Sequence, residues 1–197
     1  MMNYTTIIEF VKEQTTTNGR PSLYPFRDRF EHTMRVYRWA IKLQNKIGGD
    51  IEIISLAALL HDIGWQDEES HPDIGAQMAA DFLVDMDYDI TKIGRVCEII
   101  RRHEDKETKD KLSLECQIVM DADLLDEVGA VGILWDAMAT ACGEQPSYKR
   151  AYTRTRQFYK MNLPKKVRAK TAEGRKEYQR RMDAIEAFIN ELERELF

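Results

Sequence analysis

An almost wholly apolar segment, IEIISLAALLHD at positions 51–62, ends in an adjacent histidine and aspartate. A helix of this composition must be buried on most of its sides, because it would otherwise expose a large apolar patch. Buried imidazole and carboxylate groups lower stability unless they are paired or bind a metal ion. The segment therefore predicts a central, buried helix whose carboxyl end carries polar side chains with a shared partner. Gly64, which follows shortly after, is expected to loosen the last turn so that His61 and Asp62 can both reach that partner.

Apolar residues also recur at helical spacing before this segment. The turn-rich stretch 15–25 precedes one predicted helix, which stops at Gly48 and Gly49. Asp50 is a candidate N-cap for the central helix that follows. The apolar positions of the earlier helix are Phe26, Phe30, Met34, Tyr37 and Ile41. The chain thus predicts two consecutive helices joined by a short glycine turn.

Three further helices are predicted downstream, and a long amphipathic helix lies near the carboxyl end. The three ranges are about 72–86, about 90–103 and about 113–126. The inward positions are Ile93, Val96, Cys97 and Ile100 in the second of these, and Ile185, Phe188, Ile189 and Leu192 in the last helix. No alternation typical of strands competes with these patterns. The predicted fold class is therefore all-α, a compact single-domain helical bundle.

The composition fits one soluble globular domain over residues 1–197. Hydrophobic residues make up 43% and charged residues 32% of the 197 positions, and a chain of this length can bury a sizeable core. The net charge of -5 argues against a nucleic-acid polymer as partner, because such a surface needs an excess of Lys and Arg. The three cysteines have no C-x-x-C spacing, so we expect reduced and mostly buried thiols.

The amino-terminal stretch lacks the basic start and the apolar run of a signal peptide. No segment approaches the ~20 apolar residues that a membrane span requires. We therefore expect a cytoplasmic protein without a membrane partner. The amphipathic carboxyl-terminal helix can pack on its own bundle or on a second copy, so a homodimer stays open.

Two more apolar helices contain polar side chains of the same kind. His32 lies between Phe30 and Met34, and Asp121 and Asp123 interrupt the segment IVMDADLLD. Taken singly, a histidine on an apolar face is more often a satisfied core residue, and a terminal aspartate is more often a cap. Capping explains the two aspartates poorly, because they lie inside a predicted helix. A divalent cation is the economical shared partner, since imidazole nitrogen and carboxylate oxygen suit Mn²⁺, Fe²⁺, Co²⁺, Zn²⁺ or Mg²⁺.

The order His32, then HDIG from His61, then DADLLD from Asp121 resembles the HD-domain metal-dependent phosphohydrolase superfamily. The segments RFEHTMRVYRWA, DADLLDEVGAVGI and TAEGRKEYQRRMDAIEAFINELE resemble its bacterial branch that contains nucleotide pyrophosphatases. The resemblance implies an all-α domain with an HD core at about 26–127 and a C-terminal helical part at about 128–197. It also implies a divalent ion as cofactor, which can be Mn, Mg, Fe, Co, Ni or Zn.

Carried over residue by residue, the family pattern implies four metal ligands. These are His32, His61, Asp62 and Asp123. The family's ligand in the DADLLD segment follows an alanine, which selects Asp123 and leaves Asp121 as the alternative. The aspartate that does not bind the ion could instead orient a ligand histidine.

The other two histidines, His71 and His103, are expected catalytic residues. In family members with two metal ions, histidines in comparable places hold the second ion. This chain lacks the paired HH and the GYP segment of one such branch, so the number of ions stays open. Either imidazole could instead contact the substrate phosphate or protonate the leaving group. The alternatives are an exposed helix start for His71 and a helix-dipole partner for His103.

Proton transfer from the attacking water needs a carboxylate near the ion. Asp62 is expected both to bind the ion and to accept this proton. Asp67 and Glu68, in the acidic stretch QDEES, are further candidate bases, and the alternative is a solvated loop. These residues complete the catalytic set that the sequence predicts.

Cationic side chains must meet the remaining charge of a phosphorylated substrate. Arg35 follows His32 by one helical turn and therefore shares its face, and Arg29 does so from the other direction. Lys149 and Arg154, in a basic and tyrosine-rich stretch, are candidates for the nucleotide side of the site. The alternative for these residues is ordinary surface charge.

The expected function is a metal-dependent phosphohydrolase of small nucleotides or phosphoesters, with a nucleoside triphosphate pyrophosphatase as the finer expectation. The expected partner is a small phosphorylated molecule, with a nucleotide favoured. A cyclic-nucleotide phosphodiesterase or a nucleotide monophosphatase would use the same ligands. The alternatives from other classes are a catalytically silent module that binds metal or nucleotide and signals, and an interaction protein without a metal.

Overall fold

The computed structural model describes residues 4–17, 24–65 and 71–197, apart from the side chains of residues 166 and 167. Helices dominate these residues and no strand occurs among them, which confirms the predicted fold class. The α-helices are α1 (Tyr4–Lys12), α2 (Arg29–Ile47), α3 (Ile51–Leu60), α4 (His71–Asp85), α5 (Ile90–Arg102), α6 (Leu114–Asp126), α7 (Ala130–Ala141), α8 (Tyr148–Asn162) and α9 (Ala172–Leu196). A π-helical turn (Glu13–Thr17) follows α1, and a 3-10 turn (Leu163–Arg168) follows α8.

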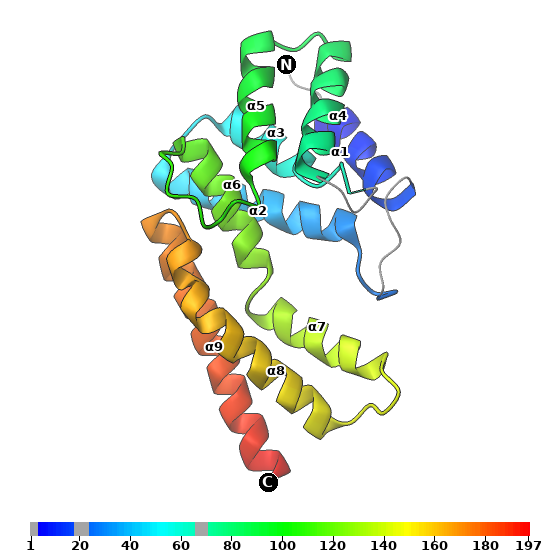
Figure 1. The fold of residues 1–197 in the computed structure, drawn as a ribbon, viewed down its shortest axis with the longest axis vertical. Helices are drawn as coiled ribbons and strands as arrows, with labels where there is room; N and C mark the ends of the chain where they lie inside the picture. Colours follow the sequence, from blue (N-terminus) through cyan, green and yellow to red (C-terminus); the bar gives the residue numbers. More distant parts are fainter. Residues whose placement is uncertain (1–3, 18–23, 66–70) are drawn as a thin grey trace.

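The helices form a core and an arm (Figure 1). In the core, α3 packs against α2, α5 and α6, and α4 pairs with α5 at one end. Every residue of α3 from Ile53 to Leu60 is buried, so the apolar segment is the central helix that its composition predicts. The arm consists of α7, α8 and α9 and extends away from the core, while the upper part of α9 contacts α2 and α6. No described helix is both long enough and apolar enough to cross a membrane.

Side-chain caps fix where the core helices begin. The Asp50 carboxylate accepts hydrogen bonds from the backbone N–H groups of Glu52 and Ile53, so this predicted N-cap is confirmed. Asp28 caps α2 through the N–H of Glu31. Because of that cap, the helix begins after Phe26, which the apolar periodicity had placed inside it. Such caps satisfy N–H groups that a helix cannot pair internally.

The predicted inward faces of α5 and α9 agree with the structure except at Phe188, with Leu192 partly buried, whereas the predicted apolar positions within α2 are all only partly buried. All four inward residues of α5 are buried, as are Ile185 and Ile189 of α9. Phe188 is 40% exposed, because α9 packs on one side only and this residue lies at the edge of its apolar stripe. Of the cysteines, two are buried and Cys142 is exposed.

Asp121 joins α6 to the start of α9. Its carboxylate accepts hydrogen bonds from the backbone N–H groups of Lys170 and Thr171 and from the Thr171 hydroxyl, at 2.6, 2.9 and 2.6 Å. Thr171 in turn caps α9. A Cβ at Gly174 would lie 2.2 Å from an Asp121 oxygen, so glycine is required for this close approach. Asp121 therefore holds the arm on the core.

We expect Asp121→Ala to lower the free energy of unfolding by about 2 kcal/mol or more, because it leaves buried donors unpaired. Urea denaturation of the metal-free protein measures this change. The exposed carboxylate of Asp183 supplies the control, and Asp183→Ala should change stability by less than about 0.5 kcal/mol. Loss of metal binding with intact stability would contradict the structural role and make Asp121 a ligand.

Candidate metal centre

Four polar side chains meet at the carboxyl end of α3. His32 comes from α2, His61 and Asp62 follow α3, and Asp123 comes from α6. The His32 Nε2 atom lies 3.3 Å from Nε2 of His61, 3.4 Å from an oxygen of Asp123 and 3.6 Å from one of Asp62. The His61 Nε2 atom lies 3.8 and 4.0 Å from oxygens of the same two carboxylates. The structure thus brings together all four expected metal ligands.

Oxygen acceptors determine how the imidazoles are oriented. Nδ1 of His61 lies 2.9 Å from the carbonyl oxygen of Ala58, and Nδ1 of His32 lies 2.8 Å from a carboxylate oxygen of Asp126. These oxygens can only accept, so each Nδ1 donates to its oxygen and both Nε2 atoms face the centre. Burial lowers the pKa of His32, but the Asp126 hydrogen bond and the nearby carboxylates outweigh it and raise that pKa, so the centre favours a positive charge. A shared cation resolves this arrangement. The donor set therefore fits a divalent metal ion with imidazole and carboxylate ligands.

Burial and neighbouring charges set the protonation of these groups. Burial lowers the pKa of the His61 imidazole to about 4, so it is neutral near pH 7. Burial alone would raise the pKa of Asp123, but Lys106 and the facing imidazoles outweigh burial and hold that pKa well below its usual value. The imidazoles likewise outweigh burial at Asp62 and lower its pKa. Two ionised carboxylates beside a neutral imidazole are the protonation states that metal binding requires.

Gly64 has a different role from the one that the sequence suggested. We expected it to loosen the last turn of α3 so that both polar residues could reach one ion. In the structure His61 keeps helical backbone angles, and a Cβ at Gly64 would lie 2.3 Å from the backbone of His71 and Gly75. Gly64 is therefore required for the close packing of this turn on α4.

Two more histidines extend the cluster around Asp62. His71 and His103 are 7% and 1% exposed, and the Nε2 atom of each lies 3.7 Å from the same oxygen of Asp62. The Glu104 carboxylate lies 3.2 Å from His71. Ligand atoms of His71, His103 and Glu104 lie within 4.8 Å of one another. His71 is thus not the exposed helix-start residue of the alternative interpretation, and all four histidines of the chain gather at this centre.

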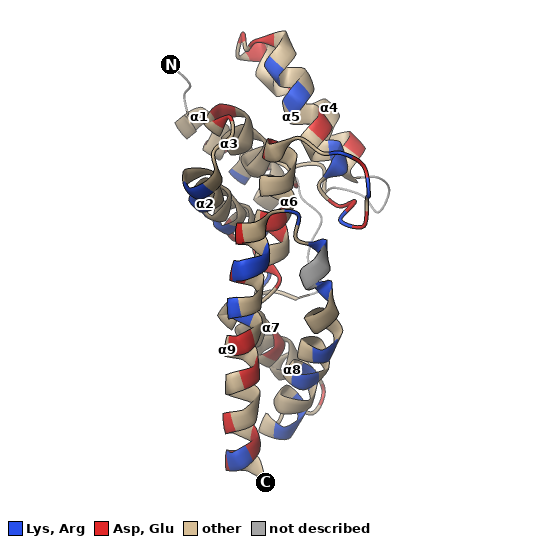
Figure 2. Cartoon of the chain, turned by 90° about the vertical axis from the view of Figure 1, so that its left-hand side faces the viewer, with Lys and Arg blue, Asp and Glu red and all other residues tan. Residues whose placement is uncertain are grey.

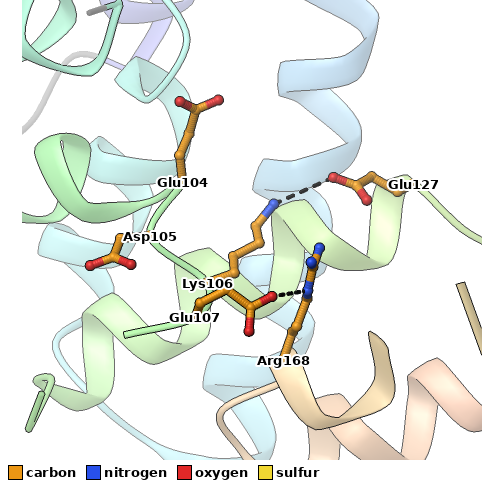
Figure 3. A pocket seen from close by; sticks show the side chains of 6 residues that line it. All are labelled: Glu104, Asp105, Lys106, Glu107, Glu127 and Arg168. Carbon is orange, nitrogen blue, oxygen red and sulfur yellow. Dashed lines mark hydrogen bonds and ion pairs between the residues drawn. The ribbon is translucent and has the colours of Figure 1, made fainter. Parts of the chain in front are cut away.

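Cationic side chains surround the cluster. Arg29 forms an ion pair with Asp62 at 2.8 Å, and its guanidinium lies 3.7 Å from the centre of the Trp65 ring. Lys106 forms ion pairs with Asp123 at 2.7 Å and with Glu127 at 3.5 Å. Figure 3 shows the second of these pairs across a small cavity of about 280 Å³. Positive charge at these positions can meet an anionic ligand of the ion.

Asp126, at the end of α6, holds His32 and Arg35 together. It accepts from Nδ1 of His32 at 2.8 Å, and Arg35 donates two hydrogen bonds to it at 2.7 and 2.9 Å. We had expected the aspartate that does not bind the ion, Asp121, to orient a ligand histidine, but Asp121 bonds the start of α9 and Asp126 takes that position. Asp126 lies one helical turn after Asp123, so the spacing was a signal that we did not use. Lys106 and Glu104 lie in a charged loop that gave no such signal.

We expect Asp126→Ala to weaken metal affinity by about 10 to 100 fold, since His32 loses the acceptor that orients it. Titration of the metal-free protein with Mn²⁺, followed by calorimetry, measures the change. Excess Mn²⁺ should restore activity, because the ligands themselves remain. Asp183→Ala is the matched control, and an unchanged affinity in Asp126→Ala would show that the contact does not support the centre.

Asp67, Glu68, Lys149 and Arg154 complete the set of predicted site residues. Asp67 and Glu68 lie outside the described residues. Basic residues recur along α8 (Figure 2). Among them, Lys149 lies over the ring of Phe197, and Arg154 forms an ion pair with Asp136 at 2.9 Å. Neither is among the described residues that line the cavity at the metal centre.

The cluster opens into a cavity of about 630 Å³ between the core and the arm. Its polar end includes His32, Asp62, His71, His103 and Asp123. Arg29, Arg35 and Lys106 also contribute to the wall. The opposite side is formed mainly by α7 and the end of α8. The volume is in the range of small-molecule sites, which are usually a few hundred to about 1,000 Å³.

Comparisons with known proteins agree with this geometry. Residues 29–127 match the family model described as HD domain. The chain is 28% identical over 171 residues to the uncharacterized protein YpgQ of Bacillus subtilis, covering 85% of this chain and 83% of YpgQ. It is similar to the crystal structure of an HD-superfamily hydrolase from Bacillus thuringiensis, with a TM-score of 0.74, 27% identity and coverage of 97% and 95% of the two chains. It is also similar to the structure of YpgQ in complex with ADP, with a TM-score of 0.70, 26% identity and coverage of 98% and 94%.

Proposed function

This chain belongs to the HD-domain superfamily of metal-dependent phosphohydrolases, and on that premise we propose that it hydrolyses a small nucleotide. The observation that carries the proposal is the convergence of His32, His61, Asp62 and Asp123 at one end of a cavity large enough for a nucleotide. The similarity to YpgQ, whose structure holds ADP, supports a nucleotide as ligand. We further propose release of pyrophosphate from a nucleoside triphosphate.

The four residues would hold a divalent ion. Such an ion supplies positive charge that polarises a phosphoryl oxygen and makes nearby water more acidic. The donor set is neutral nitrogen and ionised oxygen without sulfur, which suits Mn²⁺, Mg²⁺, Fe²⁺, Co²⁺, Ni²⁺ or Zn²⁺. His71, His103 and Glu104 offer a second group of ligand atoms, so the proposal allows one or two ions.

The chain's own side chains position the substrate and move its protons. Arg29 and Arg35 line the cavity beside the ligands, where they can bind phosphate oxygens that the ion does not reach. Asp62 faces the centre and can accept a proton from the attacking water, with Asp67 and Glu68 as further candidate bases. His71 or His103 can then protonate the leaving oxygen, because both line the same cavity. Lys149 and Arg154 stay candidates for the nucleotide side, although neither lines the cavity.

A panel of nucleotides and simple phosphoesters, assayed with each metal ion, tests this proposal. Orthophosphate and pyrophosphate are followed separately. The proposed activity gives pyrophosphate from a nucleoside triphosphate and stops on chelation. Orthophosphate alone, from mono- or triphosphates, would contradict the pyrophosphatase reaction and leave a phosphohydrolase of another bond. His61→Ala is the control for contaminating phosphatases.

A catalytically silent module is the second candidate. Its support is that Arg29 and Lys106 already pair with carboxylates of the cluster, at 2.8 and 2.7 Å, so part of the buried negative charge is balanced by the chain itself. This candidate is favoured if the protein binds a nucleotide and a metal ion but hydrolyses no compound with any of the ions. If the protein neither binds a metal ion nor hydrolyses any compound, both candidates are contradicted.

A further inference from the structure

The wall of the cavity that faces the metal centre is apolar and aromatic. Residues of α7 supply most of it, and side chains that precede α2 and that end α8 complete it. The apolar side chains are Phe26, Val131, Leu134, Trp135, Met138 and Phe158. The polar end can bind phosphates, whereas these six side chains carry no charge, and Arg27 and Lys165 are the cationic lining residues from the neighbouring segments before α2 and after α8. A ligand that fills the whole cavity must therefore join an anionic part to a flat or apolar part.

The ring of Phe158 lies close to Gly132 in this wall. A Cβ at Gly132 would lie 3.2 and 3.4 Å from two ring atoms of Phe158. The ring of Phe158 therefore packs directly on the backbone of α7, and both residues line the cavity. Trp135 lies nearby in sequence on α7, with Tyr24 in edge contact at 5.1 Å between ring centres. Aromatic rings in such a wall favour stacking with a planar heterocycle.

Asn162 adds a polar group to the end of this wall. Asn162 is among the residues that line the cavity, and it is only 2% exposed. Its amide nitrogen donates to the carbonyl oxygen of Phe158 at 2.9 Å, but its Oδ1 atom has no hydrogen-bond partner among the described residues. A buried acceptor without a partner costs about 1 to 3 kcal/mol. Because Oδ1 is itself buried, a ligand reaches it only when the Asn162 side chain turns slightly toward the cavity, and a donor on that ligand then recovers this cost.

We propose that the wall between α7 and α8 binds the base of a nucleotide, and that Asn162 selects the base by accepting a hydrogen bond from one of its N–H groups. The inference rests on the proposed function, because it assigns the second end of the same cavity. A phosphorylated lipid would fill the apolar wall but would leave Oδ1 of Asn162 without a donor. A nucleobase supplies both the planar ring and the donor.

Binding of nucleosides tests the inference without any phosphate. Adenosine, guanosine, cytidine and uridine each carry an N–H on the base, whereas purine riboside carries none. We expect the best natural nucleoside to bind the wild-type protein at least about tenfold more tightly than purine riboside, as one buried hydrogen bond predicts. Ligand-observed nuclear magnetic resonance gives the dissociation constants of both compounds.

Variants at two positions identify the source of this ratio. Asn162→Leu should reduce the ratio to within about twofold, because the acceptor is lost. Asn162→Asp keeps an acceptor and should retain the preference. Phe158→Leu should weaken all nucleosides alike by about tenfold, since stacking does not depend on the N–H group. Asn190→Leu, on the exposed face of α9, is the control and should bind as the wild type does.

The possible outcomes separate this inference from the proposed function. A wild-type ratio near one, or an unchanged ratio in Asn162→Leu, would overturn the inference, and the first result does not require that any variant folds. Hydrolysis of tripolyphosphate by the wild-type protein with Mn²⁺ reports phosphohydrolase activity without a base. Nucleoside selectivity without hydrolysis of any phosphate compound would support the base site and contradict the proposed reaction.

Discussion

Replacing His61 with alanine is expected to lower kcat/KM for the hydrolysed nucleotide by at least about a thousandfold. His61 is fully buried, its Nδ1 is committed to Ala58, and its Nε2 faces the other ligands. Alanine removes one of four ligands and leaves no side chain that can replace it. A thousandfold loss corresponds to about 4 kcal/mol of transition-state stabilisation, which is within what a metal ion supplies.

Steady-state kinetics at saturating metal measures this loss, and calorimetry with Mn²⁺ measures the accompanying loss of binding. No histidine outside the centre is available as a control, since all four belong to it. Asp183→Ala serves instead and should retain full activity. Activity within tenfold of the wild type in His61→Ala, at unchanged metal affinity, would refute the assignment of His61.

Addition of a divalent ion is expected to raise the melting temperature by roughly 10 °C, and chelation should reverse this increase. A ligand at a thousand times its dissociation constant stabilises the native state by about 4 kcal/mol, and each kcal/mol shifts the melting temperature of a domain of this size by about 2 to 4 °C. The ion binds the folded chain because its ligands come from α2, the end of α3 and α6, which converge only on folding.

Thermal unfolding with Mn²⁺, Co²⁺ or a chelator follows this shift, and His61→Ala should lose it. Asp121→Ala should melt at a lower temperature and still gain the full increase from metal, because its carboxylate bonds the start of α9. A melting temperature that changes with neither chelator nor added metal would contradict the metal centre and favour an interaction protein.

The sequence predicts the helices from local signals, and it predicts four of the cluster residues from buried polar positions taken together with the family resemblance. Asp50 caps the central helix as its position suggests, and polar residues in buried helices indicate a shared partner. The family resemblance favoured Asp123 over Asp121, and the structure places Asp123 in the cluster and Asp121 against α9. Periodicity alone left these two aspartates equivalent.

Other parts of the site depend on packing that no local pattern encodes. Lys106 reaches Asp123 from a loop, and its charged surroundings in the sequence resemble any solvated loop. Gly64 marks a close contact between two backbones and not a loosened helix end. Lys149 and Arg154 belong to a stretch whose composition is typical of phosphate binding, but on α8 neither residue lines the cavity. Asn162 becomes informative only when its unpaired oxygen and the cavity are seen together.

Anomalous diffraction from crystals grown with Mn²⁺ tests the central claim most directly. The account predicts one strong peak within about 2.0 to 2.4 Å of Nε2 of His32, Nε2 of His61 and a carboxylate oxygen of Asp62 and of Asp123. A second, weaker peak beside His71 and His103 would be compatible with it. A peak elsewhere, or none at these four side chains in the presence of bound Mn²⁺, would contradict it.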